Sequence, residues 1–321
     1  MKRILLFTII ATLFTACDSD DDNYITPITE NETVTIEAET STDNANISLS
    51  ITAQSATVDW GDGTIEIIET NPSNIEHTYK THKIYEIKIA SNNLQSFALT
   101  NEDVTKLSFT NCSNLNSLMV AHLPRLTDLD LSNCPNLTSL FALYSSELSS
   151  INIEKCKELA YVTIQSTAVT SLNFKGHSKL IRLDCSWNKL KSLDLTDSKA
   201  LISFKCNNNE IESLIFGEAP NLISVEAIFN KIKILNLSGA TDLVSLLAFN
   251  NELASVALPQ SQILSYIHLI NNKLEAPAIN IMFEKLLPRN KANCSISLQN
   301  NPGTADCNKS IAENKDWDVY L

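Results

Sequence analysis

The chain has 321 residues, 44% of them hydrophobic, which is enough to build more than one packed unit. Its 37 acidic residues outnumber the 24 basic ones and give a formal net charge of −13 at pH 7. A surface of this charge repels nucleic acid, so nucleic-acid binding is excluded as a function.

Residues 1–16 have the layout of a secretory signal peptide, in which Lys2 and Arg3 precede an apolar run from Ile4 to Phe14. The run is too short to cross a bilayer, which takes about 20 residues. The sequence FTAC at 14–17 resembles the lipobox of bacterial lipoproteins, although Phe14 stands where that family usually has Leu. The resemblance implies cleavage before Cys17, acylation of its thiol and amino group, and attachment to a membrane. The alternative is ordinary cleavage that leaves a soluble protein.

Residues 17–32 are expected to form a solvated tether, because the like charges of Asp18, Asp20, Asp21 and Asp22 cannot pack together. An acidic run directly behind a lipidated cysteine resembles the surface-export signal of lipoproteins from Bacteroidota. The resemblance implies an anchor in the outer membrane with the protein facing the cell exterior; a periplasmic orientation is the alternative. Without the two basic residues of the signal peptide, 22 basic residues face 37 acidic ones, a net charge of −15.

Between residues 33 and 93, short runs of alternating apolar residues are broken by polar turns, which predicts an all-β domain. The sequence VDWGDG at 58–63, followed by HTY at 77–79, resembles the signature of PKD-type β-sandwiches. The resemblance implies that Trp60 and Tyr79 pack in the core and that Asp62 bonds loop amides. We favour this structural role over the alternative, a metal site formed by Asp59, Asp62 and His77.

From residue 94 to residue 275 the sequence repeats, because leucines recur at 21-residue intervals at Leu180, Leu201, Leu222, Leu243 and Leu264. Each leucine starts the frame L-x-x-L-x-L-x-x-N, which resembles the leucine-rich repeat and in particular the short repeats of Bacteroidota surface proteins. Reading the frame backwards predicts nine turns, each with two extended segments, and adds starts at Leu94, Leu115, Leu137 and Leu159. A single turn cannot bury its leucines, so neighbouring turns must cover one another and both ends need caps.

An asparagine closes the first segment of each later turn, at Asn188, Asn209, Asn230, Asn251 and Asn272. We expect these side chains to bond buried backbone groups of adjacent turns, which would otherwise cost about 1–3 kcal/mol each. In the earlier turns the same position holds Leu123, Ser145 and Thr167, so their bend should differ.

Residues 276–321 are predicted to cap the solenoid. Apolar residues recur with a helical period between Pro277 and Pro288, and a strand is expected at 295–298. The sequence from Asn300 to Val319 resembles the closing segment of Bacteroidota leucine-rich-repeat proteins. The predicted fold class is therefore mainly β: a solenoid of about nine turns with a small N-terminal β-sandwich-like domain and a C-terminal cap of helix and strand.

Apart from Cys17 the chain has seven cysteines, an odd number for an oxidising compartment. Cys112, Cys134 and Cys156 share one repeat position that small residues occupy in later turns, so we expect free, buried thiols there. Cys294 and Cys307 flank a predicted turn of the cap and are the candidates for a disulfide bond.

The sequence contains no known catalytic motif and no short Cys or His spacing typical of a metal site. We therefore expect a binding protein rather than an enzyme, without a catalytic residue, a metal or a cofactor.

The candidate ligand site is an aromatic strip on the outward face of the Asn-bearing segments, formed by Tyr144, Trp187, Phe229 and Phe249. The first hypothesis is a protein partner, in adhesion or in an envelope complex. The alternatives are a glycan taken up as a nutrient, with Tyr144 and Trp187 stacking on sugar rings, and a structural spacer whose rings pack on one another. Asp184, Lys205 and Glu226 alternate in charge along one column of this face, so we expect them to pair with each other.

Overall fold

A computed structural model describes residues 32–41, 44–69, 73–289 and 294–321. The signal peptide, Cys17 and the tether up to residue 31 lie outside these residues, so their assignments stay predictions. Glu32, which the sequence placed at the end of the tether, is the first residue of a strand. Among the described residues, no helix has the length and apolarity needed to cross a membrane.

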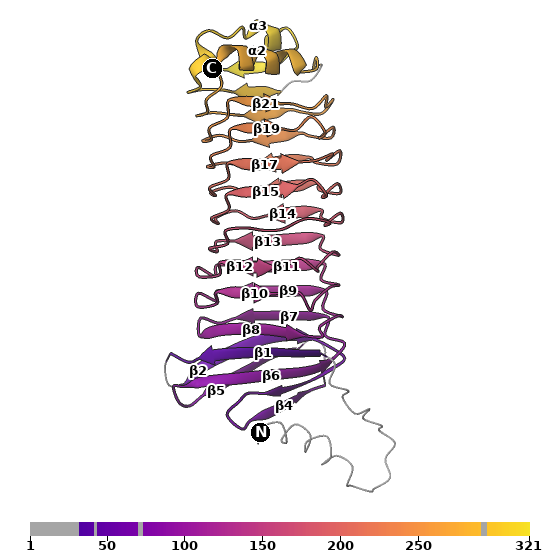
Figure 1. Ribbon diagram of the computed structural model, residues 1–321, viewed down its shortest axis with the longest axis vertical. Helices are drawn as coiled ribbons and strands as arrows, with labels where there is room; N and C mark the ends of the chain where they lie inside the picture. Colours follow the sequence, from indigo (N-terminus) through magenta and orange to yellow (C-terminus); the bar gives the residue numbers. More distant parts are fainter. Residues whose placement is uncertain (1–31, 42–43, 70–72, 290–293) are drawn as a thin grey trace.

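The N-terminal domain consists of two antiparallel sheets that share one core (Figure 1). One sheet contains, in spatial order, β4 (Ile65–Ile68), β3 (Ser55–Asp59), β6 (Ile84–Asn92), β1 (Glu32–Glu39) and β8 (Val104–Thr110). The other begins with β5 (Ser73–Tyr79), β2 (Ala45–Thr52) and β7 (Ser96–Thr100). Every second side chain of β1 and β2 is buried, as the alternating sequence predicts.

The residues of the WGDG and HTY motifs hold one end of this domain together. Trp60 and Tyr79 are buried, and the Tyr79 hydroxyl donates to the carbonyl oxygen of Trp60 at 2.8 Å. Asp62 accepts a hydrogen bond from the Thr64 amide at 2.9 Å. Gly61 has a φ of +77°, and a Cβ atom there would lie 2.5 Å from the carbonyl oxygen of Glu86, so only glycine fits. The packing and loop roles predicted for Trp60, Tyr79 and Asp62 are those seen in the structure.

The repeats form a long parallel sheet, hereafter the long sheet, that continues directly from β7 (Figure 1). Its register places equivalent residues of successive turns side by side, as for Leu183, Phe204 and Val225. The strands supplied by the repeats are β9 (Ser117–Ala121), β11 (Ser139–Leu143), β13 (Tyr161–Gln165), β14 (Arg182–Asp184), β16 (Ser203–Lys205), β18 (Ser224–Glu226), β20 (Ser245–Leu247) and β22 (Tyr266–His268).

The stack is longer than the nine predicted turns, because the cap adds two strands to the same sheet. These are β23 (Ser295–Ser297) and β24 (Asp318–Tyr320), which pair in parallel with β22 and with each other. Eleven parallel strands therefore run from β7 to β24. The fold is mainly β and solenoidal, as the sequence predicts, and the stack is straight in the view of Figure 1.

The second segment of most turns forms the opposite face of the solenoid, hereafter the back face. Its strands pair only two at a time, into three separate parallel sheets. The pairs are β10 (Asp128–Asp130) with β12 (Ser150–Asn152), β15 (Ser192–Leu195) with β17 (Ser213–Phe216), and β19 (Ile234–Asn236) with β21 (Ser255–Ala257).

The N-terminal domain and the solenoid share a single hydrophobic core. One cluster of buried residues runs without a break from Val34 in β1 to Trp317 in the cap. The sharing has a structural cause: β7 of the first repeat turn pairs with β2, and β8 of the same turn pairs with β1. The predicted boundary at residue 93 therefore separates the two kinds of sequence pattern, but the hydrophobic core continues across it. The N-terminal domain covers the first turn and so acts as the N-terminal cap of the solenoid.

The predicted asparagine ladder is present and bridges successive turns. The Asn230 amide group donates to the carbonyl oxygen of Cys206 at 2.9 Å, and its oxygen accepts from the Ile211 amide at 3.0 Å, both in the preceding turn. The same two bonds are made by Asn209, Asn251, Asn272 and Asn301. At the start of the ladder the bend differs, as expected, since the Ser145 hydroxyl accepts from the Leu123 amide at 3.2 Å.

The cap consists of α2 (Ala276–Lys285), the 3₁₀ turn η1 (Pro302–Thr304) and α3 (Ser310–Glu313), besides its two strands. The Lys315 ammonium group donates to the carbonyl oxygens of Phe283, Glu284 and Leu286 at 3.1, 2.8 and 2.9 Å. It thereby provides hydrogen-bond donors for carbonyl groups at the C-terminal end of α2. Gly303 packs against the start of α2, where a Cβ atom would lie 2.1 Å from the Ala276 nitrogen.

A buried arginine ties the cap to the last repeat turn. Arg289 donates to the carbonyl oxygens of Ser261, Gln262 and Leu264. Its guanidinium carbon lies 5.2 Å from the centre of the Trp317 ring, which itself is buried. The charge is thus paired with three carbonyl dipoles and a ring inside the core, as a buried arginine requires.

Candidate functional site

Three of the four aromatic residues predicted as a ligand site occupy the same place in their turns. Tyr144, Trp187 and Phe229 each precede the residue at the ladder position, and their exposed fractions are 52%, 56% and 52%. We call these three residues the aromatic row. Phe249 lies outside it, one column nearer the sheet and half-buried, with its ring 6.1 Å from that of Phe229 at 73°.

The backbone of the aromatic row is left-handed, with φ values of 52° at Tyr144, 60° at Trp187 and 55° at Phe229. The same conformation closes the long-sheet strand in nine consecutive turns, at His122, Tyr144, Ser166, Trp187, Asn208, Phe229, Asn250, Asn271 and Asn300. Asparagine adopts it readily, whereas other L-residues lose roughly 1–2 kcal/mol. Aromatic side chains therefore stand here against the backbone preference, which is typical of residues kept for a function.

The structure divides the contiguous aromatic strip that the sequence predicts. Half-buried apolar side chains surround the two ends of the row, with Leu143 beside Tyr144, and Ile228, Phe249 and Ile270 near Phe229. Polar side chains surround its centre. Ser166 and Asn208 occupy the equivalent left-handed position in the turns on either side of Trp187. The position one residue earlier holds Ser186 in the turn of Trp187 and Asn207 in the next turn. The row is therefore a set of separate rings rather than one apolar patch.

The rings have different aromatic neighbours. Tyr144 stacks on His122, with ring centres 4.9 Å apart and planes at 18°. Phe229 meets Phe249 edge to face. Within the described part of the chain, no ring contact involves Trp187, so its ring stays open to a ligand.

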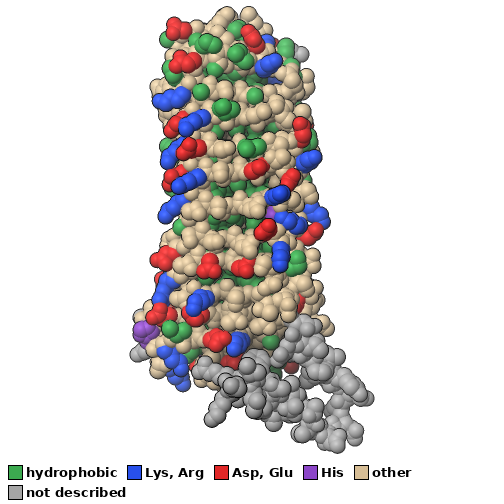
Figure 2. Space-filling view, in the orientation of Figure 1, with side chains coloured by type: hydrophobic (Ala, Val, Ile, Leu, Met, Phe, Trp, Pro, Cys, Tyr) green, Lys and Arg blue, Asp and Glu red, His purple; other side chains and the backbone are tan. Residues whose placement is uncertain are grey.

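The charged column beside the row pairs only in part as predicted, because Lys205 pairs with Glu226 whereas Asp184 bonds a backbone amide. Lys205 and Glu226 form an ion pair at 3.0 Å on neighbouring strands, and the Asp184 carboxylate accepts the Ser186 amide at 3.0 Å. The Lys205–Glu226 pair stabilises the surface and is not free to bind a ligand. Elsewhere, charged side chains gather along the two sides of the face that Figure 2 shows, with fewer in its middle.

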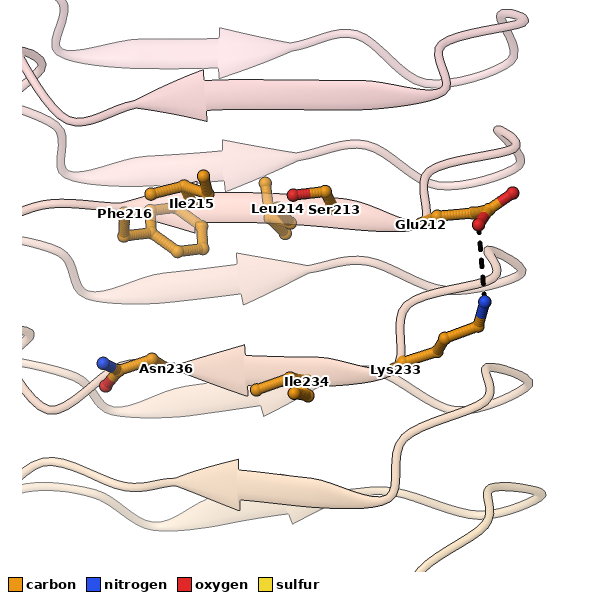
Figure 3. Close-up of a pocket in the computed structure, with 8 residues that line it drawn as sticks. All are labelled: Glu212, Ser213, Leu214, Ile215, Phe216, Lys233, Ile234 and Asn236. Carbon is orange, nitrogen blue, oxygen red and sulfur yellow. Dashed lines mark hydrogen bonds and ion pairs between the residues drawn. The ribbon is translucent and has the colours of Figure 1, made fainter.

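A second candidate, which the sequence did not indicate, lies on the back face between β17 and β19. It is a shallow pocket of about 340 Å³ at the point where two of the back-face sheets fail to join (Figure 3). Ile215 and Ile234 line it and are exposed, and the Glu212–Lys233 ion pair at 3.4 Å closes one end. Its only sequence signal is isoleucine at positions where neighbouring turns carry Ser, Asp or Asn.

The described residues contain no group of three His, Cys, Asp or Glu side chains able to hold a metal ion. At the alternative site considered from the sequence, His77 binds the Asp62 carboxylate at 2.9 Å and stacks on Trp60. Burial works to raise the pKa of Asp62, but hydrogen bonds from Thr64 and His77 outweigh it and lower that pKa. The side chains of Asp62 and His77 therefore stabilise the loop by hydrogen bonding.

The seven cysteines outside the signal region are all free thiols in the structure. A hydrogen bond between Cys112 and Cys134 lowers the pKa of Cys112 and raises that of Cys134, while burial raises the pKa of Cys156 to about 11. The free, buried thiols expected at this position are present. The disulfide considered for Cys294 and Cys307 is not formed: Cys294 is buried before β23, and the half-buried Cys307 thiol donates to Thr304 in the turn after η1.

Comparison with known proteins supports the fold assignment. No family model matches the sequence, and no curated protein matches it. Among solved structures, the functional domain of InlJ from Listeria monocytogenes, which includes a cysteine ladder, aligns with 73% of this chain at a TM-score of 0.52 and 21% identity. The alignment spans half of that domain. A leucine-rich-repeat protein of Leptospira interrogans aligns with 65% of this chain and 73% of its own length, at 18% identity and a TM-score of 0.34. The fold of this chain is that of a leucine-rich-repeat solenoid.

Proposed function

We propose that this chain is a non-catalytic, exported lipoprotein that binds a macromolecular ligand through the aromatic row. The observation that carries the proposal is the conformation of the row: three exposed aromatic residues occupy left-handed positions where asparagine is the relaxed choice. A structural spacer has no need for such residues. The fold by itself favours a protein partner, as in adhesion or an envelope complex, but the ligand class has to be argued from the row.

The proposed location rests on the N-terminal sequence. Cleavage before Cys17 and its acylation would anchor the protein, and the acidic run at 18–22 resembles a signal for export to the outer face of the outer membrane. Labelling with a palmitate analogue should mark the wild-type chain and not a Cys17→Ser variant. Protease added to intact cells should degrade the protein; its survival while a known surface protein is cut would indicate the periplasm.

Ligand binding is tested by photo-crosslinking in living cells. A photoreactive phenylalanine in place of Ser166 lies between Tyr144 and Trp187 without removing either ring. The same group in place of Ser150, which is exposed on the back-face strand β12 and lies outside the pocket between β17 and β19, is the matched control. We expect a crosslinked product from position 166 only, discrete in mass for a protein ligand and diffuse for a polysaccharide, and its loss when Trp187 is replaced as well. Equal products from both faces, or none from either, would refute the aromatic row as the binding site.

A further inference from the structure

The rings of the aromatic row stand two turns apart. The turn of Ser166 separates Tyr144 from Trp187, and the turn of Asn208 separates Trp187 from Phe229. Neighbouring strands lie about 4.8 Å apart, so the backbone positions that carry successive rings lie about 10 Å apart along the long axis. A bound polypeptide strand presents side chains on one face about every 7 Å and would miss the second ring. Two units of an extended, β-linked polysaccharide span nearly the same length as two turns of the solenoid.

The surroundings of Trp187 decide whether the ligand is a sugar chain or an α-helix. Two turns of a helix span about 11 Å, so the spacing alone would also fit a helix. A docked helix buries a continuous apolar stripe in an apolar groove. Near Trp187 the structure instead offers the hydroxyl of Ser166 and the side-chain amide of Asn208, while Asn207 is bonded to Glu226 and to the Ile228 amide. A pyranose ring has an apolar face of C–H groups and a rim of hydroxyls, which matches a flat ring flanked by such hydrogen-bonding groups.

The charges near the row favour an uncharged ligand. Lys205 pairs with Glu226 at 3.0 Å on one side, and Lys231 pairs with Glu210 at 3.2 Å beyond the bend on the other. The formal net charge of the whole chain, −13, repels polyanions. An acidic polysaccharide would therefore meet a repulsive overall field and two lysines already paired, which the exposed Lys189, two residues after Trp187, offsets only locally.

From spacing, surroundings and charge together, we infer that the aromatic row binds a neutral, extended polysaccharide lying along the long axis, with every second sugar unit stacked on a ring. The inference rests on the proposed function and names the ligand class of the same site. Trp187 occupies the centre of the bound segment, and Tyr144 and Phe229 hold its two ends.

The decisive variant is Trp187→Asn, because asparagine occupies the same position in four other turns and fits the left-handed backbone. Loss of binding in this variant cannot be attributed to unfolding. The matched control is Tyr161→Ser, which removes an exposed ring from the same sheet and places there the residue found at that position in most turns. Titration calorimetry with cello-, xylo- and manno-oligosaccharides, and with polygalacturonate as the anionic counterpart, measures the affinities.

We expect one neutral series to bind, with about tenfold weaker binding in Trp187→Asn and unchanged binding in Tyr161→Ser. Affinity should rise in two steps with chain length, since a trisaccharide reaches two rings and a pentasaccharide reaches all three. The inference is overturned if no neutral oligosaccharide binds, if polygalacturonate binds better, or if Trp187→Asn binds as the wild type does. If the inference is overturned but a protein is crosslinked at position 166, the aromatic row binds a protein and the proposed function holds. If nothing is crosslinked there, both the inference and the proposed function are refuted.

Discussion

Replacing Asn230 by alanine tests whether the asparagine ladder holds the turns together. The substitution leaves the Ile211 amide without its acceptor at 3.0 Å and removes one of the two donors to the Cys206 carbonyl, which keeps its hydrogen bond from the Asn209 side chain at 3.1 Å. Asn230, Cys206 and Ile211 are all buried, so neither group can turn to solvent. The one unpaired buried group, the Ile211 amide, costs about 1–3 kcal/mol, and we expect the free energy of unfolding to fall by roughly that amount.

Urea unfolding followed by circular dichroism measures this loss. The matched control is Asn221→Ala, which removes one exposed hydrogen bond, to the Lys199 carbonyl at 3.3 Å, and should change stability by less than about 0.5 kcal/mol. A second variant is Asn230→Asp. It keeps an acceptor for the Ile211 amide but places a carboxylate oxygen against the Cys206 carbonyl oxygen, and because these two oxygens repel each other it should lower the free energy of unfolding as much as alanine does. If Asn230→Ala costs no more than Asn221→Ala, the ladder does not stabilise the bend and the reasoning is wrong.

Three further predictions concern stability. Gly303→Ala should lower the melting temperature and expose the cap to protease, because the added methyl group would lie 2.1 Å from the Ala276 nitrogen; normal cleavage kinetics would contradict this. Burial, together with the nearby charge of Lys157, lowers the pKa of His177 in the folded chain, so stability should be complete above the unfolded value of 6.5 and decline as the pH falls below it. In a His177→Ser variant the urea midpoint should depend less on pH between 7 and 5. Trp187→Asn should raise the free energy of unfolding by about 1 kcal/mol, since it relieves the left-handed strain, and a loss of stability would refute that account.

The solenoid could be predicted from the sequence because every turn needs apolar residues at the same positions. Leu183, Phe204 and Val225 are each ambiguous alone, but their common spacing places them on one buried column. The ladder residues follow from the same frame, since a bend that repeats in register must pair the same backbone groups in every turn.

The cap was only partly predictable, because α2 interrupts the repeat before the last two strands. The strand expected at 295–298 is present as β23, and Ile296, Leu298 and Asn301, which retain the end of the frame, are the signal from which Asn301 could also have been recognised as a ladder residue. The pairing of β24 has no periodic signal at all. It depends on a contact between Ser295 and Asp318 that the sequence does not reveal.

The candidate site was predicted residue by residue, but its geometry was not. Asn208, Asn250 and Asn271 share a column with Trp187, and this preference for asparagine is the sequence signal of a left-handed turn. The half-burial of Phe249 depends on its contact with Phe229, which spacing alone cannot give. The pocket between β17 and β19 arises from a break in strand pairing, which also leaves no mark on the repeat.

The stacking of the turns has a mechanical consequence. Figure 1 shows the strands of the long sheet stacked along the long axis of the molecule, so the backbone hydrogen bonds between successive strands point along that axis. A pull between the two ends of the molecule therefore stretches these bonds in line, and they yield one turn at a time instead of sharing the load in shear. The bridging asparagines carry part of the tension at every bend. The first turn is the best protected, because both of its strands are also paired to the N-terminal sheets, so rupture under force should begin at turns that lack this second attachment.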